Sequence, residues 1–162
     1  MDDHGESGAP GLAGELTPSG HRLQARIYYA DTDFSGFVYH ARYLEFFERG
    51  RSDFLRLAGV HHTELAGGGP GEALVWVVRR MEIDFRSPAR IDDVLTVETR
   101  VTEVAGARIR MAQRLSRGDS LLVEAVVEAA VVSPGGRPRR LPRTIAEAIL
   151  RNSSPAAAAS PR

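Results

Sequence analysis

Hydrophobic residues recur at steps of three and four positions between residues 42 and 58, the spacing of one face of an α-helix. The apolar stripe consists of Tyr43, Phe46, Phe47, Gly50, Phe54, Leu57 and Ala58. Polar residues fall largely outside the stripe: Glu45, Glu48, Arg49, Ser52 and Asp53. We therefore predict one long amphipathic helix that buries an aromatic face and ends at Gly59.

A period of two residues dominates the rest of the chain and predicts β-strands. One such run covers residues 21–29, and four more cover 73–85, 94–104, 109–115 and 121–132. Short turns separate the later runs, which indicates an antiparallel meander, and the last run is apolar on both faces, as in a central strand or a subunit contact. The pattern predicts an α+β fold in which a five-stranded antiparallel sheet wraps around the helix.

The length of 162 residues fits a single domain, which we place at residues 21–151. Residues 1–20 and 152–162 are rich in Gly, Pro, Ser and Ala without periodicity, and are expected to be disordered tails.

Charge and composition exclude several classes of function. The 21 basic residues, all arginine, balance 21 acidic ones, so no overall field favours nucleic acid or an anionic membrane. The absence of cysteine excludes disulfides, thiolate catalysis and cysteine zinc sites. No secretory signal or membrane-spanning run is evident, which predicts a soluble cytoplasmic protein with no transmembrane segment.

A metal site is not predicted. His61, His62 and Glu64 lie together in a glycine-rich loop, but adjacent histidines point apart in most backbones and no further ligand is evident. A solvated loop is the favoured interpretation.

The candidate chemistry lies in residues 30–40, directly before the helix. Asp31, Asp33, Gly36 and His40 occur here. The start of a helix carries a partial positive charge and free N–H groups, which suit a developing oxyanion, and a carboxylate nearby can act as a base or a nucleophile. From these features alone, helix capping and a tight turn are favoured over catalysis.

A longer block changes that interpretation. Its positions are Tyr28, Tyr29, Asp31, Thr32, Asp33, Gly36, Val38, Tyr39, His40, Tyr43, Phe46 and Phe47. The block resembles the signature segment of hotdog-fold acyl-CoA thioesterases of the 4-hydroxybenzoyl-CoA thioesterase class, and most closely the Tol-Pal-associated (YbgC-like) branch. Residues 77–93 and 138–142 are also similar, so that the resemblance covers residues 21–151. Phe34, Ser35 and Phe37 depart from the pattern and leave the size of the acyl pocket open.

The resemblance implies hydrolysis of an acyl-CoA thioester without a cofactor. Asp33 corresponds to the family's catalytic carboxylate, either as a general base or as a nucleophile. The backbone N–H at His40 corresponds to the donor that polarises the thioester carbonyl. For its imidazole two alternatives stay open: a direct role in the reaction, or mere placement at the start of the helix. Tyr29 is a weaker catalytic candidate, for which burial in the core is the favoured alternative. Asp31 is assigned to structure.

For substrate binding, the resemblance points to the loop residues Gly36, Val38 and Tyr39. Arg79 and Arg90 are candidates for binding the phosphates of CoA, although surface charge alone is the more common role of such arginines. Phe34 and Phe37 suggest a narrow pocket for short-chain or aromatic acyl groups. Family subunits pair sheet edges, which implies a homodimer or homotetramer, and acyl carrier protein is an alternative partner to CoA.

Three alternatives remain open. A hotdog dehydratase or hydratase is disfavoured because no separate His/Asp block is present. A binding subunit for acyl carrier protein or an envelope complex, with little hydrolysis, would keep the fold without the reaction. A sister branch carries its carboxylate on the helix, which draws attention to Glu45 and Glu48, but surface positions are favoured for both.

Overall fold

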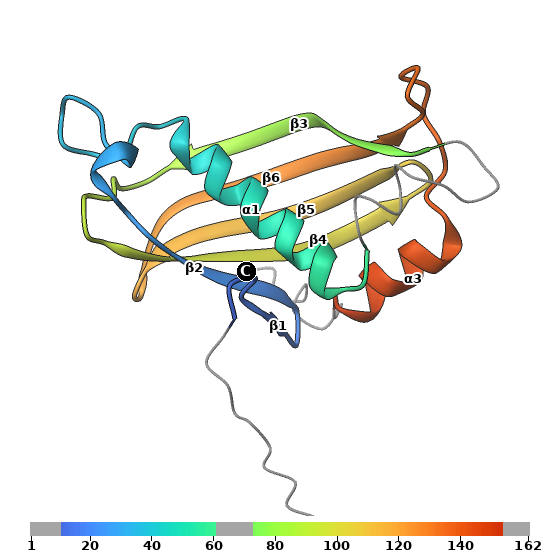
Figure 1. Cartoon of the computed structure of the whole chain (residues 1–162), viewed down its shortest axis with the longest axis horizontal. Coiled ribbons are helices and arrows are strands. Elements are labelled where there is room, and N and C mark those ends of the chain that lie inside the picture. Colours follow the sequence, from blue (N-terminus) through green and yellow to red (C-terminus); the bar gives the residue numbers. More distant parts are fainter. Residues whose placement is uncertain (1–10, 61–72, 154–162) are drawn as a thin grey trace, which may run out of the picture.

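The computed structural model describes residues 11–60 and 73–153, and Figure 1 shows the arrangement of the helices and strands. In chain order they are β1 (Glu15–Thr17), β2 (Gly20–Arg26), the 3₁₀ turn η1 (Tyr29–Asp31), α1 (Arg42–Leu57), β3 (Val75–Phe85), β4 (Val94–Ala105), β5 (Arg108–Arg117), β6 (Ser120–Val132) and α3 (Arg143–Arg151). The α+β class is confirmed. The His61, His62 and Glu64 loop lies outside the described residues.

All neighbouring strands of the sheet are antiparallel, in the order β1-β2-β4-β5-β6-β3. Strands β4, β5 and β6 form the predicted meander, and β6 is an inner strand, as its apolar faces indicate. The strand β3 precedes this meander in the sequence but pairs with β6 at the far edge of the sheet. The meander is therefore flanked by β2 on one side and by β3 on the other.

Helix α1 crosses one face of the sheet (Figure 1) and packs against β2 and β4. The strand residues below it are the predicted alternating sets, including Leu95, Val97, Ile109 and Met111, all buried. A second helix, α3, lies at one end of the sheet and buries Ile149.

The aromatic stripe of α1 is confirmed except in its last turn. Tyr43, Phe46, Phe47, Gly50 and Phe54 are buried. Leu57 is 39% exposed, whereas Leu55 is buried, which corrects the prediction for this turn. The reason is that the helix ends here: Gly59 adopts φ = 86°, and the N–H of Val60 turns back to donate to Leu55 O at 2.8 Å.

Part of the predicted N-terminal tail is ordered. Residues 1–10 lie outside the described residues, but Glu15–Thr17 forms β1 and pairs with the start of β2. The buried ring of His21 also bonds to Ala13 O through Nε2 at 2.7 Å. A three-residue strand is too short to show a period of two in the sequence, so only its pairing with β2 reveals it. The sheet thus has six strands instead of five.

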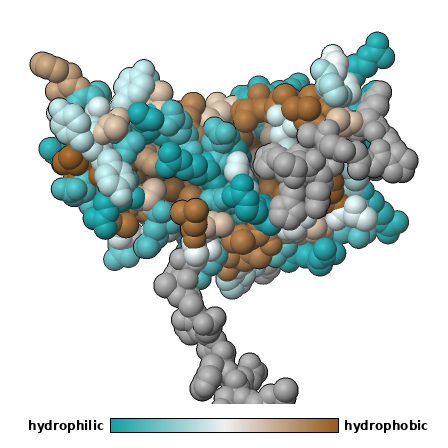
Figure 2. Space-filling model, viewed as in Figure 1, coloured by the Kyte–Doolittle hydropathy of each residue, from teal (hydrophilic) through white to brown (hydrophobic). Residues whose placement is uncertain are grey.

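One edge of the sheet exposes hydrophobic side chains. In Figure 2, hydrophobic surface gathers along the edge that β3 forms in Figure 1. Val75, Val77 and Val78 are 41–51% exposed, and the outward N–H and C=O groups of this long strand have no neighbouring strand among the described residues. Such an edge is a surface on which a second strand can pair.

Candidate active site at the start of the central helix

The loop between β2 and α1 is held in shape by its own backbone. Asp33 N–H donates to Phe37 O at 2.9 Å, Gly36 N–H to Asp33 O at 3.0 Å, and Tyr39 N–H to Asp31 O at 2.9 Å. Gly36 adopts φ = 83°, in the left-handed region that glycine reaches without strain. A side chain here would meet no atom within 4 Å, so the turn requires glycine for its conformation, and the space above it is open.

Asp33 lies exposed at the tip of this loop. Its Oδ1 accepts hydrogen bonds from the Ser35 hydroxyl and, at 2.8 Å, from the Ser35 N–H. These two bonds hold the pKa of the Asp33 carboxyl below its ordinary value of 3.8, and the charge of His40 acts in the same direction. The carboxylate is therefore ionised at neutral pH, which a base or a nucleophile requires. Ser35, noted in the sequence only as a departure from the family pattern, is the residue that orients it.

Asp31 is turned into the loop. Its Oδ2 accepts a hydrogen bond from Tyr28 N–H at 2.9 Å, and its Oδ1 lies 3.4 Å from Arg42 Nε. Arg42 also donates to Ala30 O at 3.0 Å. Through these contacts Asp31 ties the loop to the first turn of α1, as expected for a structural residue.

His40 stands two residues before the first residue of α1. Its N–H donates to no backbone acceptor among the described residues, and the N-cap residue Ala41 contributes no side-chain cap. The imidazole contacts the rings of Tyr39, at 4.7 Å between centroids, and Phe85, at 6.4 Å. The positive end of the helix, the His40 N–H and its imidazole therefore lie together, close enough to Asp33 for a charge interaction between the two side chains.

The remaining loop candidates separate into exposed and buried positions. Tyr29 belongs to η1 and is 82% exposed, so the expected core position is wrong and its hydroxyl faces solvent in the single chain. The predicted strand ends early, at Arg26, which is why Tyr29 turns outward. Tyr39 is also exposed, whereas Val38 is buried and its N–H donates to Ala89 O at 2.9 Å.

The two arginines suggested for CoA are placed differently. Arg90 pairs with Phe37 through an isolated β-bridge, and its guanidinium lies 4.5 Å from the centre of that ring, beside the Asp33 loop. Arg79 instead lies 3.3 Å from Glu128, on the sheet face opposite α1. Glu128 also contacts Arg108 and Arg110 there. The structure thus brings Arg90 to the loop, but not Arg79.

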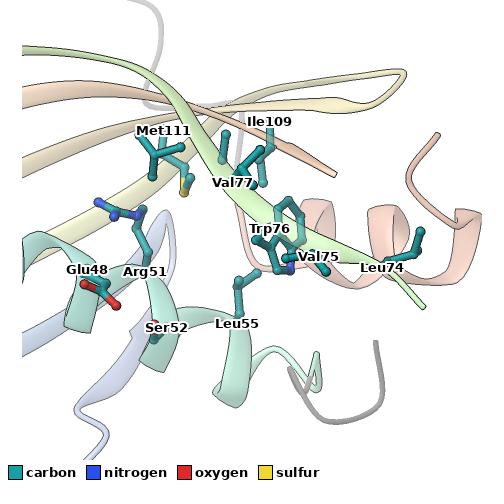
Figure 3. Close-up of a pocket in the computed structure, with 12 residues that line it drawn as sticks. Glu48, Arg51, Ser52, Leu55, Leu74, Val75, Trp76, Val77, Ile109 and Met111 are labelled. Atoms are coloured by element: carbon teal, nitrogen blue, oxygen red, sulfur yellow. The ribbon is translucent and has the colours of Figure 1, made fainter. Parts of the chain in front are cut away.

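A pocket of about 460 Å³ opens further along α1, between the helix and the first half of β3 (Figure 3). Its lining residues are Glu48, Arg51, Ser52, Leu55, Leu74, Val75, Trp76, Val77, Val78, Ile109, Met111 and Ala129. Glu48 therefore faces a pocket rim, whereas Glu45 lies 2.7 Å from Arg42 on the helix surface. Within the part of the chain that the structure describes, no group of three or more His, Asp or Glu side chains could hold a metal ion.

Sequence reasoning missed the buried polar side chains that hold Arg51, one of the residues lining this pocket. Arg51 Nη1 donates to Gln113 Oε1 at 2.9 Å, and Gln113 Nε2 donates to Phe47 O at 2.9 Å and Thr99 Oγ1 at 2.8 Å. Gln113 and Thr99 are each 1% exposed. The alternation of the strand could have revealed the buried position of Gln113, since this residue lies on the core-facing side between Met111 and Leu115.

Comparison with known proteins identifies the family of the chain. Residues 35–124 match the thioesterase superfamily. The chain belongs to this family. It is 41% identical over 135 residues to the acyl-CoA thioesterase YbgC of Haemophilus influenzae, covering 83% of this chain and 97% of that protein. It is 39% identical to the acyl-CoA thioester hydrolase YbgC of Escherichia coli O6:H1, covering 76% and 91%.

A solved structure extends the agreement to three dimensions. A probable thioesterase from Bartonella henselae shares 58% identity, with a TM-score of 0.74 over 76% of this chain and 100% of that chain. The predicted resemblance to hotdog-fold thioesterases and the predicted fold are therefore confirmed.

Proposed function

We propose that this thioesterase superfamily member hydrolyses acyl-CoA thioesters to a free carboxylic acid and CoA, with Asp33 as the catalytic carboxylate. The observation that carries the assignment of Asp33 is its ionised, exposed carboxylate at the positive end of α1, held by Ser35. The reaction is supported by the two YbgC relatives, an acyl-CoA thioesterase and an acyl-CoA thioester hydrolase, each of which aligns with most of this chain.

The proposed chemistry starts from the ionised carboxylate. Asp33 either takes a proton from the attacking water or attacks the carbonyl itself, forming a mixed anhydride that water then cleaves. In both routes the C–S bond breaks, and CoA leaves as a thiolate that takes up a proton. In both routes the developing oxyanion is stabilised by the N–H at His40 and by the positive end of α1. Gly36 leaves the space beside Asp33 open for the thioester, and no step requires a metal or a redox cofactor.

The site is completed in a homodimer, which we propose forms through β3. An antiparallel pair of β3 strands centred on Arg80 would place Val75 of one copy opposite Phe85 of its partner. The ring of His40 contacts Phe85, whereas Val75 lines the pocket beside Arg51. The pairing therefore carries the Asp33 loop of one copy toward the pocket of the other. A tetramer would be two such dimers.

Arg90 is the proposed contact for a CoA phosphate, because it lies beside the loop and no carboxylate lies within 4.0 Å of it among the described residues. A carrier-protein thioester would present a similar phosphate at this position. We place the protein in the cytoplasm, where CoA thioesters are available. The only structural observation on location is that none of the described helices is long and apolar enough to cross a membrane.

The test is release of free thiol from short, medium, long and aromatic acyl-CoAs. Asp33→Asn keeps the shape of the side chain but removes the base, so kcat/KM should fall at least about a hundredfold. His40→Ala should retain more activity, since the proposed backbone donor remains. Asp119→Asn, an exposed aspartate in the β5–β6 turn, is the matched control and should leave turnover unchanged.

The results separate the alternatives. A wild-type protein that hydrolyses none of the acyl-CoAs would overturn the proposed function. Full activity in Asp33→Asn would instead remove Asp33 from the mechanism.

A further inference from the structure

The pocket between α1 and β3 combines an apolar wall with one cation. Figure 3 shows Leu55, Trp76 and Val77 along the wall, while Arg51 extends from α1 toward Met111. An acyl group that is purely aliphatic, or aromatic without polar substituents, would need only the apolar wall for its binding. The guanidinium is therefore the feature that distinguishes this pocket.

Arg51 is fixed in place and incompletely paired. Its Nη1 binds Gln113, whose other bonds to Phe47 O and Thr99 Oγ1 leave it little freedom to move. Burial lowers the pKa of the Arg51 guanidinium, and the charge of Glu48 offsets this only in part. No carboxylate lies within 4.0 Å of Arg51 among the described residues, and a guanidinium has five N–H donors, of which Gln113 takes one.

The position of Arg51 suits the far end of an acyl group. Arg51 lies about 14 Å along the helix from Arg42, given the α-helical rise per residue, so it is remote from the Asp33 loop of its own chain. The antiparallel β3 pairing proposed above brings the partner's Asp33 loop to this pocket. The inference therefore rests on the proposed function and its dimer.

We propose that Arg51 binds a terminal carboxylate on the acyl group, so that the enzyme prefers half-thioesters of dicarboxylic acids. The methylene groups would lie against Leu55, Trp76 and Met111, and the carboxylate would take the free donors of Arg51. Glu48 stands at the exposed rim and does not occupy these donors. A methyl-terminated chain of the same length would leave the remaining donors of this half-buried cation without an acceptor, which is how a polar site rejects an apolar analogue.

The test compares glutaryl-CoA with pentanoyl-CoA, which differ in a terminal carboxylate against a methyl group. For the wild type, kcat/KM should be higher for glutaryl-CoA. In Arg51→Met the ratio of the two kcat/KM values should fall by about tenfold to hundredfold, the range for a charge-assisted hydrogen bond. Arg51→Lys should recover part of the ratio. Arg56→Met removes an exposed arginine of the same helix and should leave the ratio unchanged.

A ratio unaffected by Arg51→Met would overturn the proposal, as would a wild-type preference for pentanoyl-CoA. A merely structural role for Arg51 would lower both kcat/KM values together and leave their ratio constant. Thermal unfolding of each variant checks that the comparison is made between folded proteins.

A second measurement separates this inference from the proposed function. Trp76 is the only tryptophan of the chain and lines the pocket, so its fluorescence reports binding without turnover. Asp33→Asn is titrated with glutaryl-CoA and with pentanoyl-CoA, with and without Arg51→Met. Tighter binding of glutaryl-CoA that Arg51→Met abolishes supports the role of Arg51 even if the wild type hydrolyses neither ester. Equal binding of the two esters contradicts it.

Discussion

At the start of α1, the exposed carboxylate of Asp33 is held by Ser35, two residues away in the chain. Further along the same helix, Arg51 is held by Gln113, which lies 62 residues away on β5 and is buried. The first arrangement depends on a local turn, and the second on the packing of the helix against the sheet. We therefore expect changes in the loop to alter rate or pH dependence, and changes below the helix to alter stability.

The largest effect on stability is expected for Gln113→Leu. The substitution leaves Thr99, the Phe47 carbonyl and the Arg51 guanidinium without their partner in the interior, and should lower the free energy of unfolding by about 2–3 kcal/mol. Urea denaturation measures this directly. Gln24→Leu, on the exposed side of β2, is the control and should change stability by less than about 0.5 kcal/mol. Equal effects of the two substitutions would show that the buried bonds contribute no stability.

Gly50→Ala should have a smaller effect of the same kind. A Cβ on Gly50 would lie 2.8 Å from Thr99 Oγ1 and 3.0 Å from Val97 Cγ1, so helix and sheet would have to separate. Overpacking should outweigh the better helix propensity of alanine and destabilise the fold by about 1–2 kcal/mol. Thermal or urea unfolding tests this, with Arg56→Ala as a surface control on the same helix. A more stable Gly50→Ala protein would mean that the packing here is loose.

Ser35→Ala should have the smallest effect. It should change the pH dependence of kcat/KM and not the stability of the fold. Ser35 lowers the pKa of the Asp33 carboxyl by stabilising its ionised form, so removing the hydroxyl should raise that pKa. The acid limb of kcat/KM should therefore move to higher pH, while the value at pH 7 changes less than about tenfold, because Asp33 stays ionised there. Ser35→Thr keeps a hydroxyl and serves as the control. An acid limb that does not move would show that Asp33 does not control it.

Much of the fold could be predicted because it depends on local periodicity. The three- and four-residue spacing from Tyr43 to Phe54 fixed one face of a helix, and the alternation of Ile109, Met111 and Leu115 fixed one face of a strand. A helix or strand presents these residues to the core wherever it packs. The turn at Asp33 was also predicted, since its turn residues are contiguous, whereas the proposed role of its carboxylate came from the family resemblance.

Other features were decided by the tertiary structure. The place of β3 at the edge beside β6 depends on which strands pair, and alternation does not encode the pairing partner. The short strand β1 is defined by its hydrogen-bonded pairing with β2. In the last turn of α1, Leu55 is buried in place of the predicted Leu57 because of where the helix leaves the sheet.

The sequence by itself therefore determined the long helix and the five longer strands, most of their buried faces, the family resemblance and the candidate carboxylate. Only the tertiary structure revealed the bond between Arg51 and Gln113 and the pocket it borders. The physical reason is that side-chain periodicity is set by neighbouring residues, whereas a contact across 62 residues forms only when helix and sheet have packed together.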